Sequence, residues 1–439
     1  MGNGCNMATD ISILIENLKK NTYDDLFGGL YGNKQQIEKH KERYIRTLGA
    51  FADRYGDIPV EVFSAPGRSE ICGNHTDHQK GRVLAASITL DAIAVVAKCD
   101  EPTIHVYSEG YGDIEVDLED LEIKEAEYGT TKALIRGVAA AFADNKRMIG
   151  GFKAYATSDV LGGSGLSSSA AFEVLIGNIF SHLYNDGDVD SVNIAKYGQY
   201  AENAYFGKPC GLMDQMGCSV GGMIGIDFAS RDDAEMLSQP KYRKVEVDLD
   251  RFGYKLCIVD TKGSHANLTG EYAAVPSEMR EVAKCLGAEV LGEASEKEFY
   301  GRLAELRTKV SDRAVLRAMH YYEENKRVDA QIAALAEDDF DEFLRLIKAS
   351  GDSSYKYLQN VFATCDVANQ GVSLGLALSE KLLGGRGASR VHGGGFAGTI
   401  QAFVPSDMAD EYKKGIEALF GEGTCLMLGV RSVGGCKVL

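Results

Sequence analysis

One short stretch of the sequence concentrates side chains that can bind a polar ligand. It spans residues 65–88 and reads APGRSEICGNHTDHQKGRVLAASI. Within eleven positions it carries Arg68, Glu70, Asn74, His75, Asp77 and His78. A metal site is one interpretation, but a His-x-x-His pair on one loop supplies too few ligands by itself. The mixture of hydrogen-bond donors, acceptors and one guanidinium favours a polyhydroxylated ligand.

A glycine-rich turn directly before a predicted helix indicates an anion site. Residues 160–180 read VLGGSGLSSSAAFEVLIGNIF, with serines at the start of the helix. The first-turn N–H groups of a helix have no partner within the helix, and the helix dipole is positive there. Phosphate is the most plausible anion. The GK[ST] of a Walker loop is absent, Ser168 replaces the third glycine of a Rossmann loop, and a flexible loop with a serine N-cap is the simpler alternative.

Two further stretches could contribute to a site. In GKPCGLMDQMGC, residues 207–218, Asp214 stands among apolar residues and needs a partner or a task, unless it only caps a helix. Upstream, Glu202 lies on a predicted helix, where a solvated carboxylate is the simpler interpretation. In VHGGGFAGTIQAFV, residues 391–404, the glycines join two strand-like runs. A hairpin explains them, although three consecutive glycines also suggest close approach to a ligand or another loop.

Alternating and helical patterns predict the elements that position these stretches. Strands are expected at 60–65, 92–99, 103–108, 151–159, 222–228 and 254–261, and helices at 34–55, 132–144, 170–185 and 191–206. Beyond residue 275 the text becomes helical up to about residue 348. A helix at 366–383, strands at 388–392 and 399–404, a helix at 408–420 and a strand at 425–430 follow. This order indicates an α+β unit with helices on one face of a sheet.

Composition limits the class of protein. With 439 residues the chain is long enough for two or three domains. Its net charge of −17 argues against nucleic acid or an anionic membrane as the main partner, but leaves an anionic substrate open. The ten cysteines are scattered and indicate reduced thiols, and the N-terminus has no apolar signal-peptide core. We therefore expect a cytoplasmic protein that has no membrane partner and acts as a monomer.

Together, the four stretches resemble the galactokinases of the GHMP small-molecule kinase superfamily. The family signatures GRxNxIGEHxDYxxGxVLPxAI, PxGxGLSSSAA and GGGFGG are similar to GRSEICGNHTDHQKGRVLAASI, LGGSGLSSSAA and GGGFAG here, in the same order. The resemblance extends over roughly residues 25–434. It implies a two-domain α+β architecture with a mixed-sheet N-terminal domain, residues 1–240, and a ferredoxin-like C-terminal domain, residues 241–439. The active site would lie between them.

The resemblance also implies the substrates and the roles of individual residues. ATP and Mg²⁺ would be used to phosphorylate the anomeric hydroxyl of a monosaccharide, with Arg68 and Asp214 at that hydroxyl. The sugar would contact Asn74, His75, Asp77, Gly211 and Tyr272. The ATP phosphates would lie on Gly162, Gly163, Ser164, Gly165, Leu166, Ser167, Ser168 and Ser169, and Mg²⁺ on Ser169 and Glu202. Because Arg68 should lower the pKa of Asp214, the sequence leaves open whether Asp214 is a base or an electrostatic orienter.

Departures from the signatures keep the sugar open. The resemblance places at position 74, where this chain has Asn74, a Glu that binds the sugar at its C6 side, and it places an Asn where this chain has Glu70. Loss of a hydrogen bond to a charged group costs about 1.5–3 kcal/mol, so galactose would bind less tightly. Removal of the Glu also removes repulsion of a C6 carboxylate, which makes galacturonate an alternative to galactose. N-acetylgalactosamine is a further alternative. A non-catalytic sugar and ATP sensor on the same fold is a further alternative. The intact GLSSSAA loop, together with Arg68 and Asp214, favours an enzyme, and galactose is the expected substrate.

Overall fold

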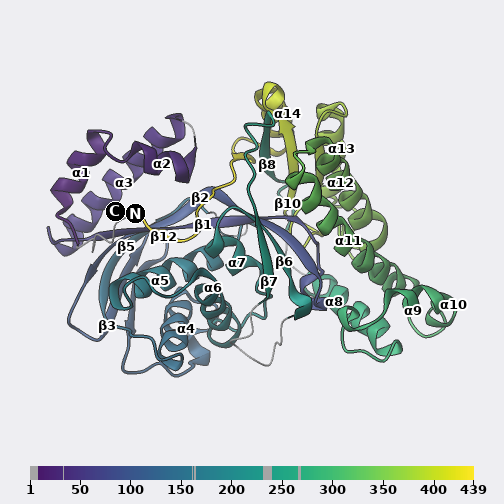
Figure 1. The fold of residues 1–439 in the computed structure, drawn as a ribbon, viewed down its shortest axis with the longest axis horizontal. Helices are drawn as coiled ribbons and strands as arrows, with labels where there is room; N and C mark the ends of the chain where they lie inside the picture. Colours follow the sequence, from purple (N-terminus) through teal and green to yellow (C-terminus); the bar gives the residue numbers. More distant parts are fainter. Residues whose placement is uncertain (1–7, 33, 161, 163–164, 231–239, 265–267) are drawn as a thin grey trace.

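The computed structural model describes residues 8–32, 34–160, 162, 165–230, 240–264 and 268–439 (Figure 1). Its strands form a larger, eight-stranded sheet and a smaller, four-stranded sheet. Helices cover both faces of the larger sheet, and most of the helices of the second half of the chain gather beside the smaller one (Figure 1). The fold therefore has the two-part α+β architecture that the resemblance implies.

The larger sheet is mixed and is built around two long strands. Its main path is β12 (Cys436–Lys437), β1 (Glu61–Cys72), β2 (Arg82–Lys98), β5 (Phe152–Ser158), β3 (Thr103–Ser108) and β4 (Gly112–Asp117). Strand β6 (Met223–Asp227) pairs with the first part of β2, and β7 (Lys241–Val245) pairs with β6. All these pairs are antiparallel except β3 with β5.

Both faces of this sheet are apolar because alternate residues of the central strands point to opposite sides. Val62, Ile93 and Val95 face the N-terminal helices α1 (Ile11–Lys19), α2 (Asp24–Tyr31) and α3 (Lys34–Tyr55). Phe63 and Ala94 face the core formed with α4 (Thr131–Asp144), α5 (Ser168–Tyr184) and α6 (Ser191–Tyr200). The loop before α5 is held against β1, because the N–H of Arg68 donates to Leu166 O at 3.1 Å.

The smaller sheet has the order β11-β8-β10-β9 and is antiparallel throughout. Its strands are β8 (Tyr254–Asp260), β9 (Ala388–Val391), β10 (Thr399–Pro405) and β11 (Cys425–Leu428). Between β8 and β9 lie α8 (Thr269–Cys285), α9 (Glu296–Gly301), α10 (Leu303–Leu306), α11 (Asp312–Ala336), α12 (Phe340–Ser353) and α13 (Gly371–Leu383). Helix α14 (Ala409–Phe420) lies between β10 and β11. This β-α-β-β-α-β order confirms the expected ferredoxin-like unit.

Most predicted elements are present, and the differences are at their ends. The helix predicted at 34–55 is α3 with the same bounds, whereas the one predicted at 366–383 begins at Gly371. The helix predicted at 191–206 is α-helical to residue 200 and continues as the π-helix η3 (Ala201–Tyr205). Strands β7 and β12, both beyond residue 240, belong to the larger sheet. The division at residue 240 stays a prediction, since the sheets themselves do not separate there.

A buried charge cluster joins the N-terminal helices, the larger sheet and the C-terminal segment. Asp91 on β2 is fully buried, with Arg43 Nη1 at 2.6 Å from one carboxylate oxygen and Arg431 Nη1 at 3.1 Å from the other. Tyr31 donates to the same carboxylate at 2.6 Å. Burial opposes the ionisation of Asp91, but the two arginines outweigh it and lower the pKa of Asp91 to about 2. The cluster therefore ties three distant parts of the chain together.

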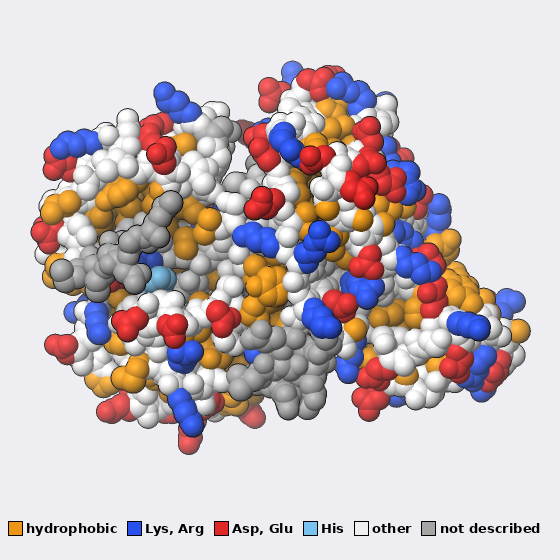
Figure 2. Space-filling model, in the orientation of Figure 1, with side chains coloured by type: hydrophobic (Ala, Val, Ile, Leu, Met, Phe, Trp, Pro, Cys, Tyr) orange, Lys and Arg blue, Asp and Glu red, His pale blue; other side chains and the backbone are white. Residues whose placement is uncertain are grey.

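The described residues have a surface of mixed charge and free thiols. Acidic and basic side chains are interspersed over the face shown in Figure 2. The nine described cysteines are all free thiols. Among the described helices, none is both long enough and apolar enough to cross a membrane.

Candidate active site

The start of α5 leaves backbone N–H groups available to an anion. Its N-cap, Ser167, has left-handed dihedral angles (φ 59°, ψ 58°), and its side chain does not cap the helix. The Ser167 hydroxyl instead donates to Asp214 Oδ2 at 2.5 Å. The first-turn N–H groups of α5 have no acceptor within the helix. A strained, uncapped helix start beside a carboxylate is typical of a functional site.

Arginine 68 fixes both the glycine-rich loop and the carboxylate. Its Nη1 donates to Gly165 O at 2.6 Å, and its backbone N–H donates to Leu166 O at 3.1 Å. Its Nε and Nη2 donate to Asp214 Oδ1 at 2.9 and 2.7 Å. Burial opposes the ionisation of Asp214, but Arg68 and the Ser167 hydroxyl outweigh it, so the pKa of Asp214 is lowered. Asp214 is therefore an anion at neutral pH.

A second pair of oxygen ligands lies at the second residue of α5, within its first turn. Ser169 Oγ donates to Glu202 Oε1 at 3.0 Å, and Glu202 is 1% exposed on the π-helix η3. Lys208 Nζ lies 2.8 Å from the same oxygen, and Gln215 bridges Glu202 Oε2 and Glu173 Oε2 at 2.8 and 3.0 Å. Within the described ranges, no three His, Cys, Asp or Glu side chains form a metal-binding group.

The predicted sugar loop folds as a tight turn between β1 and β2. Gly73 has φ 96°, and a Cβ there would lie 2.5 Å from Arg82 O, so no other residue fits without distortion. The next turn places His75 Nε2 at 3.0 Å from Gly394 O and His75 Nδ1 at 3.3 Å from His78 Nε2. Burial lowers the pKa of His75 to about 4, so the ring is neutral at physiological pH.

Three other predicted sugar contacts are held by close packing. A Cβ on Gly211 would overlap Asp77 Oδ2, so the glycine brings its backbone directly against that carboxylate. Burial raises the pKa of Asp77 to about 6, and the nearby charge of Asp214 adds to the effect. Tyr272 donates to Gly395 O at 2.8 Å and meets the Phe396 ring edge-on, with ring centroids 5.2 Å apart.

The glycines at 393–395 form the hairpin between β9 and β10 and also pack against other segments. A Cβ on Gly395 would overlap the backbone oxygen of Asn360, and one on Gly394 would lie 2.7 Å from the Tyr272 ring. Asn74 donates to Gly393 O at 2.6 Å, and its Oδ1 accepts from Asn360 Nδ2 at 2.6 Å. Both interpretations of the glycines, a hairpin and close approach to another loop, are confirmed.

Comparison with known proteins agrees with this arrangement. A family model described as "Galactokinase galactose-binding signature" matches residues 49–98. A second family model, "GHMP kinases N terminal domain", matches residues 133–222. A curated galactokinase of Streptomyces coelicolor is 30% identical over 382 residues, which cover 85% of this chain and 92% of that relative. The chain belongs to the galactokinase family.

Solved structures support the same family and fold. The galactokinase of Lactococcus lactis, solved with galactose, aligns with a TM-score of 0.74 and 25% identity over 90% of this chain and 100% of that one. The mevalonate kinase of Methanococcus jannaschii shares the fold, with a TM-score of 0.59 and 16% identity over 84% of this chain and 98% of that one. The GHMP architecture is thus common to chains of very different sequence.

Most of the residues expected from the galactokinase resemblance come together. Arg68, Asp214 and Ser167 form one hydrogen-bonded unit, and Ser169 and Glu202 form another. Asp77 meets Gly211, while Asn74, His75 and Tyr272 each contact the 393–395 segment. Gly162 is described and exposed, Ser168 begins α5, and Gly163 and Ser164 lie outside the described residues.

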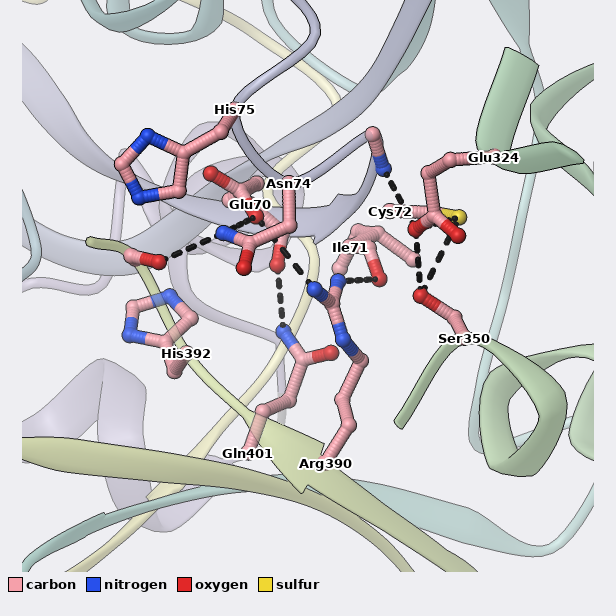
Figure 3. Close-up of polar contacts among 12 residues, drawn as sticks. Glu70, Ile71, Cys72, Asn74, His75, Glu324, Ser350, Arg390, His392 and Gln401 are labelled. Carbon is pink, nitrogen blue, oxygen red and sulfur yellow. Dashed lines mark hydrogen bonds and ion pairs between the residues drawn. The ribbon is translucent and has the colours of Figure 1, made fainter. Parts of the chain in front are cut away.

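A layer of polar residues to which no sequence motif pointed lies beneath the sugar loop (Figure 3). Arg390 Nη1 donates to Ile71 O at 2.7 Å, and Gln401 Nε2 donates to Ser69 Oγ at 2.7 Å. Arg390 and Gln401 are register partners on β9 and β10. Polar residues inside these strand-like runs were the available signal, because fully buried strand positions are normally apolar.

Proposed function

We propose that this member of the galactokinase family transfers the γ-phosphoryl group of ATP to the anomeric hydroxyl of galactose. The observation that carries the proposal is the Asp214 carboxylate, held by Arg68 on one oxygen and by the Ser167 hydroxyl on the other. Because Ser167 is the N-cap of α5, this carboxylate lies next to free first-turn N–H groups. A hydroxyl bound at Asp214 would therefore lie close to a phosphate bound at the helix.

In this mechanism Asp214 orients the sugar hydroxyl more than it deprotonates it. Its lowered pKa makes it a weak base, so proton transfer to it would be late, after the phosphoryl group has largely left ADP. Phosphoryl transfer through a loose transition state needs positioning and charge neutralisation above all. Arg68 keeps the carboxylate in place, and the α5 N–H groups stabilise negative charge on the phosphate.

Magnesium fits the second pair of ligands. Mg²⁺ prefers oxygen ligands and is often bound by one or two carboxylates together with substrate phosphates. Ser169 Oγ and Glu202 Oε1, 3.0 Å apart beside the helix start, would hold it. When bound, the ion neutralises charge on the phosphates. Lys208 places a positive charge on Glu202 and would have to give up this contact.

For the sugar we propose contacts from His75, Asp77, Gly211 and Tyr272, around the loop between β1 and β2. Asn74, which the resemblance also placed at the sugar, lies in the same pocket and is hydrogen-bonded to Glu70. Galactose is favoured because the relatives are named galactokinases and one was solved with galactose. A monomer stays the expected working unit. The free thiols support a reducing, cytoplasmic compartment.

The test is ADP release in a coupled assay with ATP and Mg²⁺ over galactose, N-acetylgalactosamine, galacturonate, arabinose, glucose and mannose. We expect turnover of galactose well above the other sugars. Asp214→Asn should abolish turnover while ATP binding is retained, and Asp188→Asn, at an exposed carboxylate, is the matched control. Full activity of Asp214→Asn would refute the mechanism. ATP binding without turnover of any sugar would indicate a sensor.

A further inference from the structure

The side-chain amide of Asn74 is hydrogen-bonded to other groups of the protein. It is 1% exposed, and its two Nδ2 hydrogens are donated to Glu70 Oε1 at 2.8 Å and to Gly393 O at 2.6 Å. Its Oδ1 accepts from Asn360, and its backbone oxygen accepts from His320 Nε2 at 2.9 Å. An amide nitrogen has only two hydrogens, so Asn74 has no donor left for a sugar.

Glu70, by contrast, has one carboxylate oxygen to which no described residue donates a hydrogen bond. Its Oε1 accepts from Asn74 and lies 3.5 Å from Arg390 Nη2, whereas Oε2 has no hydrogen-bond partner among the described residues. In Figure 3 this second oxygen points away from Asn74, to the side where the His75 ring lies. Arg68 and Asp77 are close enough to act electrostatically on the same carboxyl. The Glu70 side chain is 6% exposed, and a carboxylate oxygen to which no described residue donates, among residues of the sugar site, is suited to accept a hydrogen bond from a ligand.

We propose that Glu70 is the residue that selects the hydroxymethyl end of the sugar, and that Asn74 positions Glu70 instead of binding the sugar. The inference deepens the proposed function and rests on it. Relative to the signature GRxNxIGEH, this chain has exchanged Asn and Glu between positions 70 and 74. The two side chains are hydrogen-bonded to each other, so the exchange keeps one carboxylate and one amide in the same pocket.

The exchange bears directly on which sugar is accepted. An ionised Glu70 accepts a hydrogen bond from a C6 hydroxyl but repels a C6 carboxylate. A 6-deoxy sugar would leave Oε2 buried without a partner. The site should therefore favour galactose over both 6-deoxygalactose and galacturonate. Asn74 alone had suggested galacturonate, because it removed the expected carboxylate from position 74; Glu70 supplies one instead.

The experiment compares galactose with 6-deoxygalactose and galacturonate at pH 8, where Glu70 is mostly ionised because its pKa is about 7. Both kcat/KM and the Kd from calorimetry are measured for the wild type, Glu70→Gln, Asn74→Ala and the exposed-site control Glu115→Gln. For the wild type we expect galactose to exceed 6-deoxygalactose by about 10- to 100-fold. The Glu70→Gln variant should lower this ratio about tenfold and improve galacturonate relative to galactose.

The ratio of kcat/KM, or of Kd, between galactose and 6-deoxygalactose distinguishes a change in sugar recognition from a folding defect. Damage to the fold would lower both sugars equally, whereas loss of the Glu70 contact lowers only galactose. Asn74→Ala should also reduce the ratio, because Glu70 loses the amide that orients it. Equal wild-type affinity for galactose and 6-deoxygalactose would overturn the inference without any variant, and so would an unchanged ratio in Glu70→Gln.

The proposed function can fail separately. If no sugar is phosphorylated, the kinase assignment fails, while the Kd ratios still test the role of Glu70. If galactose is phosphorylated but Glu70→Gln keeps the wild-type ratio, only the specificity inference fails. If neither galactose nor 6-deoxygalactose binds, both proposals are refuted.

Discussion

Replacing Glu70 by Gln should stabilise the protein at alkaline pH but not at acid pH. Burial raises the pKa of Glu70 to about 7 from an ordinary value of 4.5, although Arg390, Arg68 and the amide of Asn74 act in the opposite direction. Between these two values the folded chain holds a proton that the unfolded chain has lost. Stability therefore falls as the pH rises from about 4.5 to 7. The difference between the folded and unfolded pKa values corresponds to a loss of about 3 kcal/mol in the free energy of unfolding at pH 8. A Gln at this position cannot ionise and therefore does not cause this loss.

Urea denaturation followed by circular dichroism at pH 5 and pH 8 measures this effect. The free energy of unfolding of Glu70→Gln, relative to the wild type, should be about 2.5 kcal/mol more favourable at pH 8 than at pH 5, because part of the effect is already present at pH 5. Glu115→Gln, at an exposed carboxylate, should show no such difference. If Glu70→Gln is instead the less stable protein at pH 8, the ion pair with Arg390 dominates and the argument from burial is wrong.

Three other substitutions test separate parts of the structure. Asp91→Asn removes a shared carboxylate from two buried guanidiniums, of which Arg43 keeps an ion pair with Asp159 at 3.1 Å, and should lower the free energy of unfolding by about 3–5 kcal/mol at pH 7 in urea denaturation. Because the pKa of Asp91 is about 2, its contribution in the wild type is present above pH 4 and is lost as the pH falls towards 2. Gly211→Ala should raise the KM for galactose at least tenfold and leave the KM for ATP unchanged, whereas Gly270→Ala, where a Cβ meets nothing, should change neither. Ser167→Ala removes a hydrogen bond from Asp214, so the pKa of Asp214 should rise. The acidic limb of the pH profile of kcat/KM should then move to higher pH by about one unit. If the limb does not move, Asp214 does not control it.

Sequence patterns predicted the elements well where local periodicity was strong. The 22-residue helix α3 has its predicted bounds, because its apolar positions recur with helical spacing and Gly56 ends it. The short strands β7 and β12 were not predicted. The side chains of β7 are mostly exposed and β12 has only two residues, so both exist because a neighbouring strand offers hydrogen bonds, which is not encoded locally.

The site was predictable where one stretch carries several of its residues, and less so where distant strands meet. The resemblance placed Arg68 and Asp214 together, although they are 146 residues apart. The resemblance could not show that both amide hydrogens of Asn74 are donated to protein oxygens, because these oxygens belong to Glu70 and Gly393. The direction of an amide depends on every partner around it, and a sequence lists only its type.

The cost of Glu70 to stability and its proposed role in specificity have the same physical origin. A carboxyl whose pKa is raised by burial is one whose charge the protein alone solvates poorly. Arg390 lies 3.5 Å away and Asn74 supplies a single hydrogen bond, so the carboxylate is only partly compensated in the free protein. A sugar hydroxyl donated to Oε2 would supply the missing contact, and a sugar without it would not. The deficiency that makes the residue costly in the free protein is therefore what allows it to discriminate between ligands.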